Sequence, residues 1–291
     1  MAEPGGTAAR IALEAIGLLP DTEIDPADAA LQLARLDSSD ADWRDAAAVL
    51  SELARDASVL GEAFRGHGGH DDATYRAGAL AAILHGRHGF RGDQLRYDDL
   101  DNANLVRVIE RRRGLPVALG LLWLHCIRAA GWEGWGVDFP GHFLLALTAG
   151  GAGASGSGAD RAPVLVDAFN NGAVMNAEAL RAARRRLGHE DAALQPGMLR
   201  PMSTRDVLLR LQRNLVQRRL AADAPADALR ALDGMLLIAP DEAQNRLLAA
   251  DLHARMGQVA EAIGQLEWFL RLVPEGRVAE QVRLRIDALR R

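Results

Sequence analysis

The sequence contains no lysine, so all 34 of its basic residues are arginines. This absence excludes any mechanism that depends on a lysine amine of this chain. The net charge is -5, and such an acidic balance does not favour a nucleic-acid partner. We therefore expect this protein not to bind nucleic acid.

Cysteine is nearly absent as well, because Cys126 is the single one. A disulfide within the chain is excluded, and a reducing cytoplasm is the simplest setting. Long hydrophobic runs are also missing, since the longest lies near Val117–Leu124 and a membrane helix needs ~20 apolar residues. The first 20 residues lack the basic start and apolar core of a signal peptide. We expect a cytoplasmic protein without a membrane partner.

What is present is the composition of a globular chain, with 49% hydrophobic and 25% charged residues. The first half predicts helices. In "DPADAALQLARL", Asp25 suits a helix cap and Pro26 the first helical position. A further helix is expected from about Asn104, with Gly114 ending it.

The pattern changes after residue 114. "GLPVALGLLWLHCIRAAG" (Gly114–Gly131) is apolar at nearly every position and predicts a buried helix with Pro116 in its first turn. Three short β-rich runs, "WEGWGVDF", "HFLLALTA" and "APVLVDAF", predict strands. The Gly/Ser-rich segment Ala149–Asp160 predicts a flexible hairpin loop.

From Ser203 onward the chain is helical and repeats. Ala226–Glu242 aligns with Ala260–Gly276, and the matched alanine, leucine, Met/Phe and proline positions lie 34 residues apart. A 34-residue period with this order of positions is the tetratricopeptide pattern. The charged amphipathic stretch at the end, "RVAEQVRLRIDALRR", fits a capping helix.

Two residues of the middle segment could carry chemistry. His142 stands where the turn of "DFPGHFLLAL" becomes a strand, and Asp167 lies on the next strand, in "VLVDAF". A carboxylate can fix the tautomer of an imidazole, so the two could form a hydrogen-bonded pair. The pair could be catalytic, or it could be structural, with His142 packed against Phe139 and Phe143 and donating one N–H to Asp167 or to a backbone carbonyl.

The segments "YDDLDNANLVRVIERRRGLPVALGLLWLHCIRAAGW", "GVDFPGHFLLAL" and "VLVDAFNNG" resemble the bacterial SirB-one-type family. That family joins a transglutaminase-like domain to C-terminal tetratricopeptide repeats. The resemblance covers roughly residues 25–291, and its closest motifs are Asn102–Leu105, Gly114–Leu119, Phe139–Leu144 and Asp167–Gly172. It implies a fold with a thiol at a helix start, a histidine on the next strand and an aspartate beyond it.

The chain departs from true transglutaminases at the thiol, whose place falls near Pro116 or Val117. Cys126 lies about 15 Å further along the same helix, among apolar neighbours, and is expected to be buried and inert. No residue is therefore assigned a catalytic role. His142 and Asp167 remain candidates, and with Asn102 and Pro116 they are the residues expected to line a ligand pocket.

Two histidine pairs and two arginine runs could also form binding sites, but the sequence supports these sites less well. His67–His70 and His85–His88 have spacings that could hold a metal, but neither has cysteine support, so we expect no metal and no cofactor. The runs Arg111–Arg113 and Arg184–Arg186 are most simply solvated helix ends. They could also hold a phosphate or an acidic partner, although the overall acidity argues against nucleic acid.

The sequence thus predicts an α+β fold. A helical N-terminal part and a transglutaminase-like, papain-like core with a small antiparallel sheet precede an all-α repeat region. The expected divisions are an N-terminal segment (1–24), the transglutaminase-like domain (25–202) and the repeats with their cap (203–291).

Three functional hypotheses follow. The first is a pseudoenzyme that binds a protein or peptide partner through its repeats. The second is a hydrolase or transferase acting on amide bonds with His142 and Asp167 and no cysteine nucleophile. The third is a scaffold in which only the repeats matter.

Overall fold

The structure is a computed structural model of the 291-residue chain. It describes residues 4–38, 43–66, 72–149, 163–186, 188, 193–195 and 197–291. They form two compact units. One is made of the described residues within Asp21–Ala34 and Asp40–Leu208, and the other of those within Met1–Pro20, Arg35–Ser39 and Leu209–Arg291. The α+β class is confirmed.

The unit centred on residues 40–208 combines helices with an antiparallel sheet. Its helices are α2 (Pro26–Asp37), α3 (Trp43–Gly66), α4 (Ala73–Ala81), α5 (Leu105–Arg111), α6 (Pro116–Ala129) and α7 (Ala177–Arg186). Of α2, the residues up to Ala34 belong to this unit. The strands follow the order β6 (Ala173–Val174), β5 (Val164–Asp167), β4 (His142–Leu147), β3 (Gly134–Phe139) and β7 (Arg200–Met202). Strands β3, β4 and β5 are the three that the sequence predicts, whereas β6 and β7 carry no such pattern.

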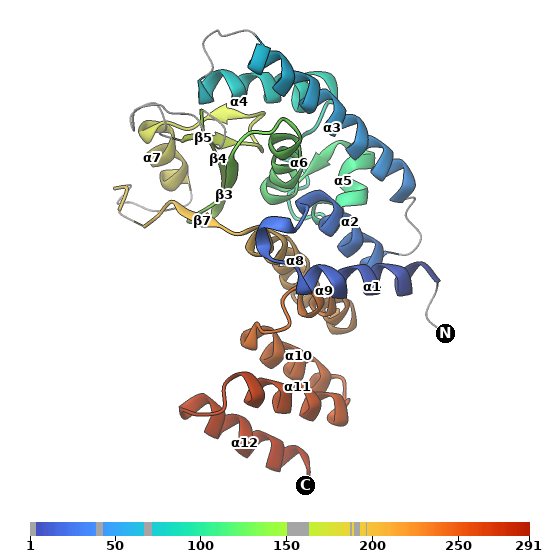
Figure 1. The fold of residues 1–291 in the computed structure, drawn as a ribbon. Helices are drawn as coiled ribbons and strands as arrows, with labels where there is room; N and C mark the ends of the chain where they lie inside the picture. Colours follow the sequence, from blue (N-terminus) through green and yellow to red (C-terminus); the bar gives the residue numbers. More distant parts are fainter. Residues whose placement is uncertain are drawn as a thin grey trace. The chain divides into compact units, whose positions relative to one another are not determined.

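Helix α6 lies against one face of this sheet (Figure 1). Its first turn is fixed because the Leu115 N–H donates to the carbonyl of Asn102 at 2.9 Å. Helix and sheet approach closely at Gly120, where an added Cβ would lie 2.2 Å from Cε1 of Phe143 on β4. The opposite face packs against α7, through Val137 and Leu180 among others. The sheet is therefore covered on both faces. This packing fixes the start of β4, where His142 lies, and the end of β5, where Asp167 lies.

Two local expectations are wrong. Helix α5 ends at Arg112, which adopts a left-handed φ of 56°, and Gly114 does not end it. Gly114 instead pairs with Gly92 in a short parallel ladder of β1 (Arg91–Gly92) and β2 (Arg113–Gly114). The arginine run that begins at Arg111 is not a solvated helix end, because Arg111 forms ion pairs of 3.0–3.1 Å with the carboxylates of Asp93, Asp99 and Asp101.

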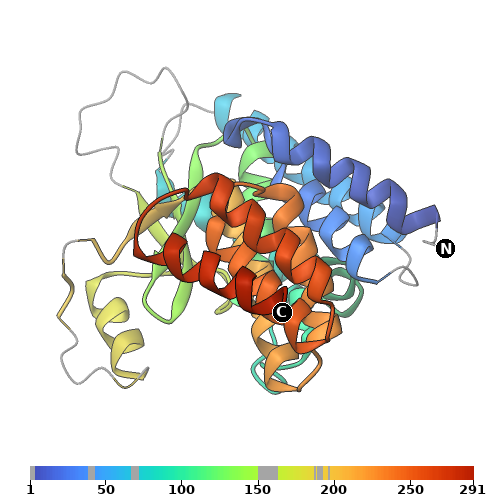
Figure 2. The ribbon, with the colours of Figure 1, turned by 90° about the horizontal axis from the view of Figure 1, so that it is seen from below.

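The other unit contains the repeats. Its helices are α1 (Pro4–Leu18), α8 (Thr204–Ala221), α9 (Pro225–Ile238), α10 (Ala243–Arg255), α11 (Val259–Leu272) and α12 (Arg277–Leu289). Of α8, the residues from Leu209 onward belong to this unit. The small positions Ala228 and Ala262 are fully buried, and α11 and α12 lie side by side (orange to red in Figure 2). The repeat pattern read from the sequence is confirmed.

Helix α1, which the sequence does not predict, packs against α9. The contact is close at Gly17, where an added Cβ would lie 2.2 Å from the carbonyl oxygen of Leu237. In the same unit the guanidinium of Arg219 binds both carboxylate oxygens of Asp37, at 2.5 and 2.7 Å. The repeat unit is thus completed by residues from the beginning of the chain.

Two predicted segments, most of the loop Ala149–Asp160 and the pair His67–His70, lie outside the described residues. Within the described ranges, no helix is both long and apolar enough to cross a membrane.

Candidate functional site

His142 is positioned by the tight turn between β3 and β4. Phe139 and His142 pair across this turn, which Pro140 and Gly141 form. Gly141 has a φ of 73°, a conformation that glycine adopts without steric cost. The turn therefore fixes the backbone of His142 at the first position of β4, with 17% of its side chain exposed.

Asp167 ends β5 and accepts hydrogen bonds on both carboxylate oxygens. Its Oδ2 lies 2.9 Å from Nε2 of His142 and 2.6 Å from the amide nitrogen of Asn170. Its Oδ1 accepts from the backbone N–H groups of Phe169 and Asn170. The predicted pair of His142 and Asp167 is therefore present, on neighbouring strands.

Burial on its own would raise the pKa of Asp167, because only 2% of its side chain is exposed. The hydrogen bond and charge of His142, together with the hydrogen bonds from Asn170, outweigh burial, so the pKa lies below its ordinary value. Asp167 stays ionised, and its Oδ2 can accept a hydrogen bond from an N–H at Nε2 of His142. In a neutral ring, a proton on Nε2 would leave the lone pair on Nδ1.

His142 and Asp167 line a cavity of about 640 Å³, which we call the cleft. Pro116, at the start of α6, lines the same cleft, as the resemblance to transglutaminase-like folds implies. Asn102 does not line it. This residue is fully buried, donates its side-chain amide to the carbonyl of Arg96 at 2.6 Å and supports the start of α6 through its own carbonyl.

Cys126 lies in the second half of α6 and is completely buried. Burial raises the pKa of its thiol to about 12, and the negative charge of Asp56 adds to the effect. Cys126 is not among the residues that line the cleft. This thiol cannot act as the nucleophile of the His142–Asp167 pair.

Several cleft residues are not evident from the sequence. Gln94 and Tyr97 come from the loop after β1, Phe169 and Asn170 from the turn after β5, and Arg186 from the end of α7. Only the residues directly after Asp167 carry a local signal, since the closest motifs of the resemblance run on to Gly172. The run that includes Arg186 is only partly a solvated helix end, because its first residue, Arg184, is buried.

The His85–His88 pair does not converge on one point. His85 is buried in the π-helical turn η2 (Ala82–Arg87), where Nδ1 lies 2.6 Å from the carbonyl of Phe90 and Nε2 accepts from Trp123. Burial lowers the pKa of His85, with hydrogen bonding to Phe90 opposing it, so the ring is neutral. The two hydrogen bonds give His85 a packing role.

His88 instead meets Glu52 and Asp56 of α3, and its Nε2 lies 2.8 Å from a carboxylate oxygen of Asp56. Arg87 forms an ion pair of 2.9 Å with the same carboxylate, and Arg112 acts electrostatically on Glu52. Two guanidinium groups already balance the two carboxylates, so we interpret this cluster as an ion-pair network that joins α3 to η2.

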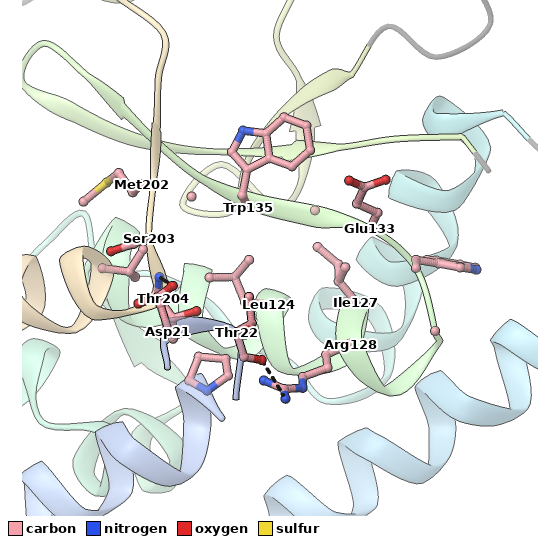
Figure 3. A pocket seen from close by; sticks show the side chains of 16 residues that line it. Asp21, Thr22, Leu124, Ile127, Arg128, Glu133, Trp135, Met202, Ser203 and Thr204 are labelled. Carbon is pink, nitrogen blue, oxygen red and sulfur yellow. Dashed lines mark hydrogen bonds between the residues drawn. The ribbon is translucent and has the colours of Figure 1, made fainter. Parts of the chain in front are cut away.

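A second cavity of about 680 Å³ lies between β3, the second half of α6 and the start of α8 (Figure 3). Its polar groups serve the fold. Arg128 donates to the carbonyls of Ile24 and Thr22, and the Asp21 carboxylate accepts the first N–H groups of α8, from Thr204 and Arg205, at 2.8 Å. This cavity contains no pair comparable to His142 and Asp167.

Comparison with known proteins gives two family matches. The transglutaminase-like superfamily matches residues 45–213, and the tetratricopeptide repeat matches residues 215–287. This combination supports a role in protein interaction.

Individual proteins are also similar. A UPF0162 protein of Xylella fastidiosa (strain Temecula1) is 31% identical over 209 residues, 70% of either chain. One of Vibrio cholerae is 28% identical over 220 residues, 75% of this chain and 77% of the relative. Mouse F-box only protein 21 is 28% identical over 207 residues, 65% of this chain and 32% of the relative. No solved structure matches.

Proposed function

The chain belongs to the transglutaminase-like superfamily, and from that premise we propose that it acts by binding protein or peptide without forming a covalent bond to it. One observation carries the proposal. Pro116 faces the cleft at the start of α6, where the superfamily's thiol is expected, and a proline ring has no nucleophilic atom. The one cysteine is buried away from the cleft.

In this proposal the repeats bind the partner protein. Trp268 on α11 is 37% exposed, and the guanidinium carbons of Arg246 and Arg271 lie 4.7 and 4.2 Å from its ring centroid. Tryptophan and arginine are the residue types that most often dominate binding energy at interfaces. The cleft would bind a peptide segment reversibly, with His142 as a hydrogen-bonding group.

Labelling with electrophilic probes tests the absence of covalent chemistry. The chain has no lysine and its one thiol is buried, so few side chains are available for unspecific reaction with an electrophilic probe. We expect the native protein to keep its unmodified mass after treatment with iodoacetamide or a peptidyl vinyl sulfone. Saturable modification of one residue, abolished by His142→Ala, would contradict the proposal.

Partner capture tests the role of the repeats. Trp268→Ala should weaken capture of a protein partner, whereas His142→Ala should leave capture by the repeats intact. Weakening by both variants would mean that the cleft contributes to the same interaction. If Trp268→Ala abolished every measured activity of the protein and His142→Ala changed none of them, the scaffold hypothesis, in which only the repeats matter, would be favoured.

A second candidate is hydrolysis of amide bonds, and the exposure of His142 to the cleft favours it. Nδ1 would take a proton from water as its oxygen attacks the carbonyl carbon, and the imidazolium would then protonate the departing amine. Asp167 would hold the ring throughout. Turnover that is lost in His142→Ala and kept in Cys126→Ala would establish this activity, and equal rates in wild type and His142→Ala would exclude it.

We also propose that the protein works in the cytoplasm. Its one cysteine is a free, buried thiol, which suits a reducing compartment.

A further inference from the structure

We propose that the cleft recognises a peptide carboxylate next to an apolar side chain, and that Arg186 is the cation that binds this carboxylate. The proposal rests on the proposed function, because it names the chemistry of the peptide that the cleft would take. It depends on the charge, the apolar lining and the unused hydrogen-bonding groups of the cleft.

The charge that the cleft offers to a ligand is positive. The carboxylate of Asp167 is buried, and hydrogen bonds from His142, Phe169 and Asn170 already use both of its oxygens. Arg186 lines the cleft and is exposed, and it forms no hydrogen bond or ion pair with any residue that the structure describes. An anion placed in the cleft therefore meets a guanidinium that has no described counter-charge.

Most of the remaining lining is apolar. Tyr97 and Phe169 contact each other edge to face at a centroid distance of 5.7 Å, and both line the cleft. Val174 on β6 is 44% exposed and Tyr97 is 42% exposed, so both offer apolar surface to a ligand. A ligand with an apolar side chain would remove this surface from water.

The form of the cleft favours a carboxylate over a phosphate. Among the described lining residues, Arg186 is the single one with a guanidinium, and it can bind a carboxylate through two parallel N–H donors. A phosphate carries nearly twice the charge and is usually held by several donors. The side chain of Gln94 also lines the cleft and has no hydrogen-bond partner among the described residues. Its amide can both donate to and accept from a peptide group, which favours a peptide over a simple fatty acid.

Peptide binding to the full chain, followed by fluorescence polarisation, tests the proposal. Three labelled peptides distinguish the sources of the carboxylate: one ending in Leu-Leu with a free C-terminus, the same peptide amidated, and an amidated peptide with an internal Glu-Leu. We expect the free carboxylate to bind at least tenfold more tightly than its amide, which corresponds to ~1.4 kcal/mol. Stronger binding of the internal Glu-Leu peptide than of the plain amide would assign the carboxylate to a side chain.

Matched variants identify the cation. Arg186→Gln should weaken the carboxylate peptide about tenfold and leave the amidated peptide unchanged, corresponding again to ~1.4 kcal/mol. Arg185→Gln is the control, because Arg185 is an exposed neighbour on α7 that does not line the cleft. Equal weakening by the two variants, or competition by inorganic phosphate, would overturn the proposal.

The outcomes separate this proposal from the one on which it rests. Equal binding of the free and amidated peptides would keep the cleft as a peptide site and reject recognition of a carboxylate. If peptides are cleaved with dependence on His142, the proposed function by binding alone fails and the hydrolase candidate holds. Carboxylate recognition would then still hold only if Arg186→Gln raised KM for the free-carboxylate peptide and left kcat unchanged.

Discussion

The carboxylate of Asp167 accepts hydrogen bonds on both oxygens while only 2% of its side chain is exposed. The native state therefore stabilises its ionised form, and its pKa lies below the ordinary value. A lowered native pKa contributes stability above the unfolded pKa of ~3.9, and that stability is lost as pH falls through the native pKa.

Asp167→Asn should therefore lower the free energy of unfolding by about 1.5–3 kcal/mol at pH 7, because hydrogen bonds to a charged group are lost. The difference between wild type and variant should shrink as pH falls through ~4 and below, where the wild-type carboxylate is protonated as well. Urea unfolding followed by circular dichroism at several pH values measures it. The control is Asp138→Asn, because this partly exposed carboxylate lies 3.5 Å from the exposed guanidinium of Arg200. The control should change the free energy of unfolding by less than ~1 kcal/mol. A difference that is constant with pH would contradict the assignment.

Cys126 offers a second test at this scale. Because burial raises the pKa of its thiol to about 12, the native protein should not react with Ellman's reagent at pH 8. Unfolding in urea should release one reactive thiol per chain, since Cys126 is the single cysteine. Absorbance of the released thiolate measures both states. Fast reaction of the native protein would show that α6 opens readily or that the thiol is accessible.

Helix α6 and the strands beside it hold the site together, and Gly120 is where they come closest. An alanine Cβ there would meet the Phe143 ring at 2.2 Å, and Phe143 directly follows His142 on β4. We expect Gly120→Ala to destabilise the protein by about 1–3 kcal/mol, despite the better helix propensity of alanine.

Gly78→Ala is the matched control on α4. No atom lies within 4 Å of an added Cβ there, so this change should stabilise the protein by about 0.5–1 kcal/mol. Thermal unfolding of both variants measures the pair. A stabilising Gly120→Ala would mean that helix and sheet separate at no cost.

The same elements show what the sequence could predict. Strands β3 to β5 combine β-rich runs with turn residues, so the sequence predicts them locally. The resemblance to transglutaminase-like folds predicts that Pro116, His142 and Asp167 lie near one another, and all three line the cleft. Strands β6 and β7 have two and three residues, too few for a periodic pattern. The left-handed turn at Arg112 was missed because this conformation favours glycine.

Site residues from irregular segments were missed for a related reason. Gln94 and Arg186 reach the cleft through the path of a loop and the end of a helix, and no spacing rule links them to His142. Asn102 was expected in the cleft on the basis of its motif alone. Its side chain and carbonyl instead support the turn before α6.

At the scale of the molecule, the repeat unit includes residues from the beginning of the chain. Arg219 and Asp37 form a buried ion pair within it, with 10% and 5% of their side chains exposed. Removal of one partner leaves a buried charge unpaired. The pair therefore holds residues 35–38 in place.

Arg219→Met should lower the free energy of unfolding by about 3–5 kcal/mol, and the double variant with Asp37→Leu should recover part of that loss. Urea unfolding measures both. Arg285→Met is the control, because its ion pair with Asp251 is exposed and should be worth less than ~1 kcal/mol. A double variant less stable than Arg219→Met would contradict this account, because the loss would then not come from an unpaired Asp37 carboxylate.

The packing of α1 against α9 also implies a delay during synthesis of the protein. Ala9, Leu13 and Ile16 are buried in the finished protein, yet about 200 residues must be synthesised before α9 exists. At ~5–20 residues per second, the apolar face of α1 stays without its packing partner for on the order of 10–40 s after its synthesis. Helix α1 is thus synthesised well before the helix it packs against, and during that interval its apolar face is open to a chaperone or to a wrong contact.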